Sequence, residues 1–324
     1  MICLGIESTA HTLGIGIVDS KGTVLANAKK SFFPDEGIHP REAAVHHTKH
    51  AMELVSLALA SAKIDAVDID LISFSQGPGL SPSLKVGAVV ARTLALELKK
   101  PILGVNHCVS HIEIGKLKTG VKDPIIVYAS GGNTQIIGLS GKKYRVFGET
   151  LDIGIGNMID KFARKVGLGN PGGPIIEKIA KKGKYIDMPY SIKGMDMSFS
   201  GLLTFAVNAF ILKKEKIEDV CYSLQHNAYS MVVEVTERAL SHTGKSEVLL
   251  TGGVAASKML QGMLEVMCTE RGAKFNVVPV DVAGDNGAMI AWQGLIEYEG
   301  GRRQKMTDTE PNPKWRTDEV EVGY

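Results

Sequence analysis

The sequence predicts an α/β protein built from two related halves. Short apolar segments with strand character alternate with longer helical segments, and the order of these segments in the first half is repeated in the second. A chain of 324 residues exceeds the size at which a single core is usual, so two domains are expected. The content of 44% hydrophobic and 22% charged residues is typical of a folded globular protein.

The first half begins with three strands, the second and third joined by the polar turn Asp19-Ser-Lys-Gly22. A fourth strand runs into Gln76-Gly-Pro-Gly79 and a helix from about Pro82, and a fifth leads to Asn106 and His107. The strands expected here are residues 2–6, 13–18, 23–28, 70–75 and 102–105.

The second half repeats this order. Three strands are again separated by polar turns, a fourth enters Gly252-Gly253 and a helix from about Ala255, and a fifth leads to Gly284-Asp-Asn-Gly287 and a final helix. The strands expected here are residues 125–129, 135–139, 144–147, 247–251 and 275–280. An insertion at 149–200 has no counterpart in the first half.

The repeated order resembles the actin, Hsp70 and sugar-kinase fold, in which two lobes close on a nucleotide. We therefore expect an N-terminal lobe at 1–123, a C-terminal lobe at 124–299 that carries the insertion, and an irregular tail at 300–324. Ligands of open α/β sheets bind beyond the carboxyl ends of strands, and glycines there let backbone N–H groups approach an anion. Gly131-Gly132 and Gly252-Gly253 occupy such positions, so phosphate binding is weighed against simple tight turns.

His107 and His111 are four residues apart, a spacing that puts two helical side chains on one face. Two imidazoles in this arrangement can bind one metal ion, although two helix histidines with unrelated partners would share the spacing. The repeat is expected to bring Asp285 to the opposite lip of one cleft from His107, and Tyr128 at a strand end is a further candidate ligand. Such nitrogen and oxygen ligands suit iron(II) or zinc. The alternative role for Asp285 is the N-cap of the last helix.

Charge is uneven along the chain although the net charge is only +2. Residues 158–193 contain eight Lys or Arg and three Asp or Glu, an excess that can meet phosphates or can be a solvated helix face. The four cysteines are widely spaced, which argues against a disulfide framework or a cysteine zinc site. With no signal peptide or membrane-spanning run expected, a cytoplasmic protein without a membrane partner is predicted.

Ten ordered segments between residues 5 and 289 carry a more specific resemblance. They are Gly5-Ile-Glu-Ser-Thr-Ala-His-Thr12, His39-Pro-Arg-Glu42, Ser75-Gln-Gly-Pro-Gly79, Asn106-His-Cys-Val-Ser-His111, Tyr128-Ala-Ser-Gly-Gly-Asn-Thr134, Gly156-Asn-Met-Ile-Asp-Lys161, Gly172-Gly-Pro174, Ser198-Phe-Ser-Gly201, Gly252-Gly-Val-Ala-Ala256 and Asp285-Asn-Gly-Ala-Met289. In this order they resemble the universal tRNA threonylcarbamoyl-transferase family, whose archaeal and eukaryotic members belong to the KEOPS complex and were formerly described as endopeptidases.

The resemblance implies transfer of a threonylcarbamoyl group from threonylcarbamoyl-AMP to N6 of the adenosine 3′ of the anticodon, in tRNAs that read codons beginning with adenine. It implies one divalent metal, iron(II) ahead of zinc, held by His107, His111, Tyr128 and Asp285. The residues implied to contact the acyl-adenylate, or an ATP- or AMP-like nucleotide, are Tyr128, Ala129, Ser130, Gly131, Gly132, Asp160, Gly173, Glu177 and Ser257. Ser257 replaces an asparagine of many relatives, so a hydrogen bond there is shorter or lost.

The resemblance also implies partners. These are tRNA, which the basic insertion would meet, a small atypical kinase and a small dimerisation subunit. Some archaeal members carry the kinase fused at the C-terminal end. No residue is identified as the general base; Glu7 and His11 are candidates for that role or for structural ones. Two other classes compete with the transferase: a metalloprotease, which would need a carboxylate base that HExxH spacing does not supply here, and an ATP-dependent chaperone or kinase of the same fold.

Overall fold

The computed structural model describes residues 1–34 and 37–323. Positions 35 and 36 of the expected first lobe and position 324 of the expected tail therefore lie outside the described residues. The chain divides into two compact units, the first formed by 1–118, 141–144 and 285–324 and the second by 119–140 and 145–284. This division differs from the expected boundaries because the last helix and the tail belong to the first unit.

The first unit contains a five-stranded sheet with the order β3-β2-β1-β4-β5. β1 pairs antiparallel with β2 and parallel with β4, and β5 continues the parallel side. The strands are β1 (Ile2–Glu7), β2 (Thr12–Asp19), β3 (Val24–Ser31), β4 (Leu71–Gly77) and β5 (Ile102–Asn106). The helices are α1 (Pro40–Ala62), η1 (Ala66–Asp68), α2 (Ser81–Leu98), α3 (His107–Thr119) and α10 (Gly287–Glu299).

The second unit repeats this topology with the order β8-β7-β6-β11-β12. β6 pairs antiparallel with β7 and parallel with β11, as β1 does with β2 and β4. The strands are β6 (Ile125–Ala129), β7 (Thr134–Ser140), β8 (Lys143–Glu149), β11 (Glu247–Thr251) and β12 (Lys274–Val277). The helices are α7 (Ile217–Thr243), η2 (Gly253–Ala256), α8 (Lys258–Glu270) and α9 (Val280–Ala283). The predicted α/β class with a duplicated arrangement of strands is confirmed.

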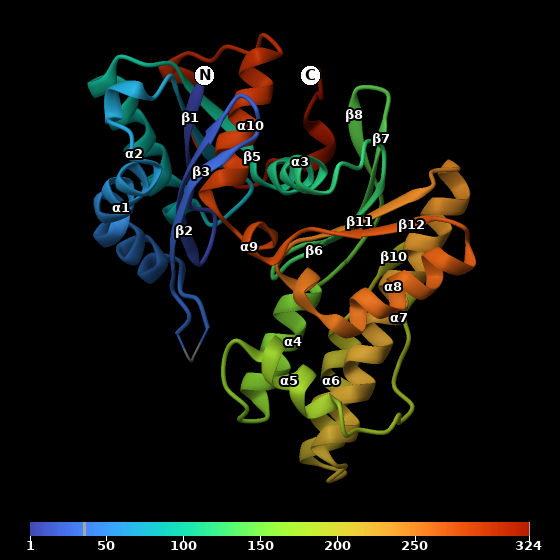
Figure 1. Cartoon of the computed structure of the whole chain (residues 1–324). Helices are drawn as coiled ribbons and strands as arrows, with labels where there is room; N and C mark the ends of the chain where they lie inside the picture. The colour runs from blue at the N-terminus through green and yellow to red at the C-terminus, as the bar shows by residue number, and fades with distance from the viewer. Residues whose placement is uncertain (35–36, 324) are drawn as a thin grey trace. The chain divides into compact units, whose positions relative to one another are not determined.

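The expected insertion forms its own small group of elements in the second unit (Figure 1). They are α4 (Ile155–Lys165), α5 (Gly172–Ala180) and the short strands β9 (Ile192–Lys193) and β10 (Asp196–Met197), and α6 (Ser200–Ile211) begins where the insertion ends. Buried residues of α4 and α5, Phe162 and Ile176 among them, join the core that β6 and β11 form with α7. The insertion is thus part of the second unit's core rather than an appended loop.

Helix α10 packs on the sheet of the first unit, where it crosses β1 and β2 (Figure 1). Glycines on both surfaces permit this close approach, and Gly16 and Gly287 make the tightest contacts. A Cβ atom on Gly16 of β2 would lie 2.1 Å from the backbone nitrogen of Ala288, and one on Gly287 would lie 2.0 Å from the nitrogen of Gly16. Because α10 docks here, Asp285 at its N-terminal end belongs to the same unit as β5 and α3.

Most expected strand boundaries shift by a few residues, and two differences lie in the second unit after β11. The last strand of the second half ends at Val277 rather than at Val280, which instead opens α9. Pro279 explains the early end, since proline has no N–H to donate to a sheet. The helix expected from Ala255 begins with the 3₁₀ turn η2, and α8 follows after Ser257.

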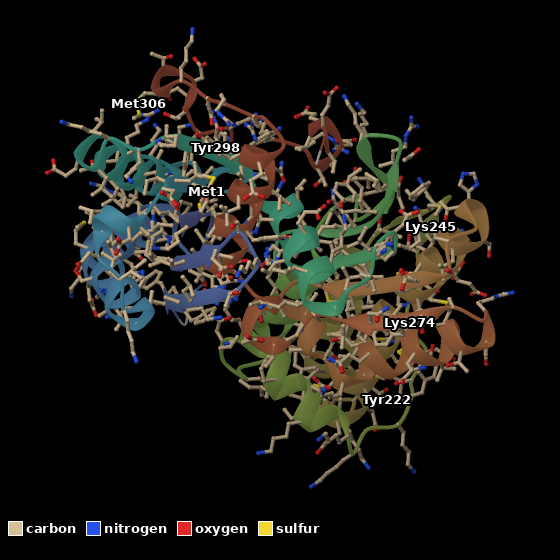
Figure 2. All side chains as sticks on the ribbon, turned by 45° about the horizontal axis from the view of Figure 1, so that its top comes forward. Met1, Tyr222, Lys245, Lys274, Tyr298 and Met306 are labelled. Carbon is tan, nitrogen blue, oxygen red and sulfur yellow. The ribbon has the colours of Figure 1, made fainter. Side chains whose placement is uncertain are left out.

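The tail from Gly300 lies on the first unit. Its described residues contain two 3₁₀ turns, η3 (Met306–Asp308) and η4 (Thr317–Glu319), and otherwise irregular backbone. Met306 packs against the first unit's core, and the guanidinium of Arg303 lies 3.6 Å from the ring centroid of Tyr298, which is labelled with Met306 in Figure 2. Among the described residues, none of the helices has the length and the apolar character needed to cross a lipid bilayer.

Candidate functional site

The carboxyl end of β5 positions the histidine pair. Asn106 ends the strand and its side-chain oxygen accepts hydrogen bonds from the backbone nitrogens of Cys108 (3.0 Å) and Val109 (3.1 Å), so it caps α3. Helix α3 therefore starts at His107, and His111 lies one turn further on the same face. The ring centroids of the two histidines are 4.8 Å apart, and the rings are nearly perpendicular.

Asp285 completes a cluster with both histidines. Its Oδ1 lies 3.2 Å from Nε2 of His111 and 3.6 Å from Nε2 of His107. One ligand atom from each of the three side chains falls within 4.8 Å of the others. The three predicted residues are thus brought together, but by a different route from the one expected. They belong to a single unit, because α10 docks on the first sheet, and do not face each other from two lobes.

The helix that follows Asp285 is capped by its neighbour. The side-chain oxygen of Asn286 accepts a hydrogen bond from the backbone nitrogen of Met289 at 3.0 Å. This assigns the N-cap of α10 to Asn286 and leaves the carboxylate of Asp285, 14% exposed, directed at the histidines. The capping role considered for Asp285 from the sequence is therefore wrong.

Glu7 is a functional candidate whose role the sequence did not show. It is fully buried at the end of β1, and its Oε2 lies 2.9 Å from Nδ1 of His107. Its Oε1 accepts hydrogen bonds from the backbone nitrogen (2.7 Å) and hydroxyl (2.5 Å) of Thr9. Both oxygens are thus engaged, which fits a carboxylate that orients a histidine and not a general base. Carboxylates of this kind fix the tautomer and direction of metal-binding imidazoles.

Burial and charge shift the pKa values of the cluster in different directions. Burial alone would lower the pKa of His107, but the charge and hydrogen bond of Glu7, with the charge of Asp285, outweigh it and raise that pKa to about 9. Burial lowers the pKa of His111 below its usual value despite its hydrogen bond to Asp285. Burial would raise the pKa of Asp285, yet the two neighbouring histidines hold it well below its usual range.

The donor set fits a divalent transition metal. Two imidazole nitrogens and one carboxylate oxygen converge, and the other nitrogen of His107 is held by Glu7, so that Nε2 points to the carboxylate. Glu113, the next acidic residue on α3, is a poor candidate for a hydrolytic base. It is buried, forms an ion pair with Lys116 at 3.0 Å and accepts a hydrogen bond from the hydroxyl of Tyr144.

The residues predicted to contact a nucleotide lie in the second unit, where β6 and β11 end side by side. Tyr128 is the register partner of Thr251 and is buried. The turn after β6 is supported by α4, whose Gly156 and Asn157 nitrogens donate to the carbonyls of Ser130 (3.1 Å) and Gly131 (3.0 Å). Gly252, with φ of +93°, passes so close to Ala129 that a Cβ atom would lie 2.4 Å from its carbonyl oxygen. Gly252, the first glycine of the second Gly-Gly pair, is therefore needed for the close approach of two backbone segments.

The polar members of this predicted set are engaged at helix N-termini. Asp160 Oδ1 accepts from the backbone nitrogen of Gly172, the first residue of α5, at 2.8 Å. Glu177 Oε1 accepts from the nitrogen of Lys258 at 2.8 Å, at the start of α8. Ser257 is the N-cap of α8, with its hydroxyl 3.5 Å from the nitrogen of Leu260. The hydroxyl of Ser257 is therefore engaged as a helix cap.

Open space remains beside these caps. A Cβ atom added to Gly132, Gly173 or Gly253 would have no atom of the structure within 4 Å. Tyr229 of α7, which the sequence analysis did not single out, is buried at the same place. Burial and the charge of Glu177 raise its pKa to about 12, against the hydrogen bonds of Ser257 and Gln225. The phenol is therefore a neutral hydrogen-bonding group at physiological pH.

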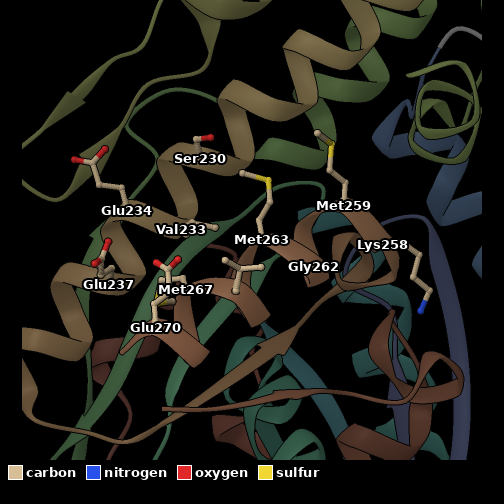
Figure 3. Close-up of a pocket in the computed structure, with 11 residues that line it drawn as sticks. Ser230, Val233, Glu234, Glu237, Lys258, Met259, Gly262, Met263, Met267 and Glu270 are labelled. Carbon is tan, nitrogen blue, oxygen red and sulfur yellow. The ribbon is translucent and has the colours of Figure 1, made fainter. Parts of the chain in front are cut away.

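A separate groove of about 560 Å³ lies between α7 and α8 (Figure 3). Met259, Met263 and Met267 of α8 line it together with the carboxylates of Glu234 and Glu237. Of the predicted site residues, none lines this groove.

Comparison with known proteins identifies the family. The family model of TsaD, tRNA N6-adenosine threonylcarbamoyltransferase, matches residues 22–292. A Thermococcus kodakarensis protein with that name is 58% identical over 99% of both chains. A Methanobrevibacter smithii relative, named a probable bifunctional tRNA threonylcarbamoyladenosine biosynthesis protein, is 56% identical, and the chain spans 60% of its length.

Solved structures of lower identity share the fold. The crystal structure of T. kodakarensis HypF matches with a TM-score of 0.65 and 16% identity, covering 92% of this chain and 48% of that one. Component A of the Acidaminococcus fermentans (R)-2-hydroxyglutaryl-CoA dehydratase matches with a TM-score of 0.57 and 13% identity, covering 92% and 99%. The family model and the full-length relatives decide the identity: the chain belongs to the tRNA N6-adenosine threonylcarbamoyltransferase family.

Proposed function

We propose that this protein transfers a threonylcarbamoyl group from threonylcarbamoyl-AMP to N6 of the adenosine 3′ of the anticodon, in tRNAs that read codons beginning with adenine. The observation that carries the proposal is the convergence of His107, His111 and Asp285 in a chain that shares 58% identity with a relative named for this activity. We also propose a cytoplasmic location, where such tRNAs are used.

The reaction exchanges one bond for another at a single carbonyl. The N6 amine of the adenosine bonds to the carbamoyl carbon, the bond from that carbon to the AMP phosphate oxygen breaks, and the amine loses one proton. A divalent metal, iron(II) in preference to zinc, would be held by His107, His111 and Asp285. When bound, it would supply Lewis-acid polarisation or orientation of the acyl group. Tyr128 is proposed as a further ligand on the strength of the family resemblance alone.

The chain's own residues would bind and orient the donor. Backbone N–H groups of the turn at Gly131 and Gly132 are proposed to meet the phosphate, since glycine leaves them accessible. Glu177 uses Oε1 for both of its bonds to the start of α8, so its Oε2 is proposed to accept from a ribose hydroxyl. Asp160, near Gly173, is likewise proposed to accept from a ribose hydroxyl through its second carboxylate oxygen, because its Oδ1 already accepts from the start of α5.

The acceptor is proposed to dock on the insertion. All seven of its lysines are exposed: Lys161, Lys165, Lys178, Lys181, Lys182, Lys184 and Lys193. A second basic run at Lys213, Lys214 and Lys216, which the sequence analysis did not count, adjoins it, since the backbone nitrogen of Lys184 donates to Asp219 at 2.6 Å. Phosphate contacts of this kind bind the nucleic acid without reading its sequence.

Partners are proposed from the relatives. The name and length of the bifunctional relatives favour a second activity that acts with this one, which we propose to be the small kinase of the KEOPS complex, together with its dimerisation subunit. The test is a transfer assay with purified protein, threonylcarbamoyl-AMP and unmodified tRNA, with and without those partners. The modified nucleoside in digested tRNA supports the proposal. Hydrolysis of a protein substrate, or ATP turnover without modified tRNA, would favour the protease or kinase alternative.

A further inference from the structure

The tail between residues 304 and 316 contacts β4 and β5, and β5 leads directly into the metal-binding helix α3. The backbone nitrogen of Asn312 donates to the carbonyl of Gln76 at 2.7 Å, and the nitrogen of Gly79 donates to the carbonyl of Pro313 at 3.2 Å. A Cβ atom on Gly77 would lie 1.8 Å from the carbonyl oxygen of Asn312. The tail is thus in direct backbone contact with the end of β4.

Two glutamine side chains strengthen this contact. Gln76, nearly fully buried, donates through Nε2 to the carbonyls of Asp308 (3.0 Å) and Glu310 (2.7 Å). Gln304 accepts from the backbone nitrogen of Gly104 in β5 at 2.7 Å and donates to Oε1 of Gln76 at 3.1 Å. Buried donors and acceptors of this kind are costly to leave without partners, so the tail segment is held firmly to both strands.

Asn106 links this segment to the metal ligands. It is fully buried in β5 opposite Gly77 and precedes His107 directly. Its Oδ1 caps α3, and its carbonyl accepts from the hydroxyl of Ser110 at 2.8 Å. Its Nδ2 donates to the carbonyls of Trp315 (3.2 Å) and Arg316 (3.4 Å) in the tail. One amide therefore has its oxygen on the metal-binding helix and its nitrogen on the tail.

We propose that Asn106 is a positioning residue of the metal site, through which the tail segment 304–316 fixes the first turn of α3 and with it the direction of both histidines. This inference rests on the proposed metal site. It assigns the tail a role in metal binding, because the carbonyls of Trp315 and Arg316 hold the amide that caps the helix. A ligand supported in this way binds metal more tightly, since its orientation is fixed before the ion arrives.

Substitution by serine separates the two functions of the amide. In Asn106→Ser the hydroxyl keeps an acceptor for the α3 cap, where serine is as good as asparagine, but the donor to the tail is removed and no charge is introduced. Trp315→Ala perturbs the tail side of this link. It removes the indole ring, whose centroid lies 5.8 Å from the guanidinium of Arg302. Neither residue is a metal ligand.

Asn276→Ser is the matched control. Asn276 also donates through Nδ2 to two backbone carbonyls, those of Val248 (3.4 Å) and Lys274 (3.4 Å), but it lies on β12 in the second unit. The control therefore loses the same number of hydrogen bonds without touching α3 or the tail. It corrects for any general loss of stability.

The experiment titrates Co(II), a spectroscopic stand-in for the physiological ion, into the metal-free full chain under anaerobic conditions and records the visible d–d absorption. We expect Asn106→Ser and Trp315→Ala to bind Co(II) about 10-fold more weakly than the wild type, with an altered band shape, while Asn276→Ser retains the wild-type affinity and spectrum. Amide hydrogen exchange of the 304–316 peptide provides a second readout. Binding and tail order are linked reciprocally, so Co(II) is expected to slow this exchange in the wild type and to slow it less in Asn106→Ser.

The outcomes separate this inference from the metal assignment. If the wild type binds Co(II) and both variants keep its affinity, its spectrum and its exchange pattern, the positioning role of Asn106 is wrong. If the wild type itself binds no Co(II), the metal site of the proposed function fails. Should Asn106→Ser not fold, Trp315→Ala and the exchange of the wild-type tail decide the question.

Discussion

Oε2 of Glu7 lies 2.9 Å from Nδ1 of His107, so the first strand of the chain holds the first residue of the metal-binding helix. This carboxylate is engaged on its other oxygen by Thr9 and is fully buried. The contact leaves Nε2 of His107 directed toward Asp285, which is the arrangement a metal ligand needs.

Glu7→Gln is therefore expected to weaken Co(II) binding about 10- to 100-fold, as loss of such supporting carboxylates does elsewhere. The control is Glu53→Gln, which removes a similar contact of 2.8 Å between a carboxylate and His50 on the surface of α1. Equal Co(II) affinity in the two variants, measured by visible absorption, would show that Glu7 does not orient His107.

The docking of α10 is expected to be sensitive to a single methyl group. Gly16→Ala places a Cβ atom 2.1 Å from the backbone nitrogen of Ala288, so the helix must shift. Overpacking of this kind costs about 1–3 kcal/mol in the free energy of unfolding, and the shift would also displace Asp285.

Gly262→Ala on α8 is the comparison, because its added Cβ atom meets nothing within 4 Å. Alanine there is expected to stabilise the helix by up to about 1 kcal/mol. Urea denaturation of both variants gives the measurement. A Gly16→Ala protein as stable as the wild type would contradict the packing described for α10.

His47 predicts how stability depends on pH. It is fully buried on α1, and its Nε2 lies 3.1 Å from the carbonyl of Ala10. Burial, with the charge of His46, lowers its pKa from 6.5 to about 4. Between pH 6.5 and 4 the unfolded chain therefore binds a proton that the folded chain does not. The contribution of His47 to the free energy of unfolding is fully present above pH 6.5. It falls as the pH drops from 6.5 to 4, by up to about 1.4 kcal/mol per pH unit.

The variant His47→Gln keeps a neutral donor for Ala10 but removes the titrating ring. Its free energy of unfolding is expected to fall less steeply than that of the wild type between pH 6.5 and 4, with similar slopes above pH 7. Denaturation measured at several pH values tests this, and parallel curves for the two proteins would rule out a buried neutral histidine.

The basic insertion predicts the salt dependence of tRNA binding. Lys181 and Lys182 are exposed after α5. In the double variant Lys181→Gln with Lys182→Gln, the fall of log affinity with log salt is expected to be less steep, by about 0.7–0.9 for each phosphate that the variant no longer neutralises. The control double variant, Lys21→Gln with Lys85→Gln, changes exposed lysines outside the insertion. A filter-binding series in salt measures the slope, and identical slopes for both double variants would exclude this surface.

Most of the fold could be predicted from local patterns. The strand runs and the order of elements follow from apolar segments and turn residues, which are properties of neighbouring positions. β6 and β11 were placed with their observed bounds, at Ile125–Ala129 and Glu247–Thr251. The same reasoning could not place α10, because its docking depends on Gly16 and Gly287, residues far apart in the chain that meet only in the folded structure.

The site was predictable in part for the same reason. The spacing of His107 and His111 is local, and Asp285 was chosen from the repeat, although the repeat suggested the wrong geometry for it. Glu7 and Asn106 act through contacts that the sequence does not display, one across the sheet and one to the tail. The sequence also could not show whether Asp285 or Asn286 caps α10. The cap depends on the direction of each side chain, and packing fixes that direction.

The most direct test of the account compares threonylcarbamoyl transfer to tRNA by the wild type and by His107→Ala combined with His111→Ala, each loaded anaerobically with iron(II) and supplied with the same donor and partners. We expect the double variant to lose both the bound iron and the formation of modified tRNA, while remaining folded. Undiminished transfer by a double variant that binds no metal would show that this histidine pair does not serve the reaction.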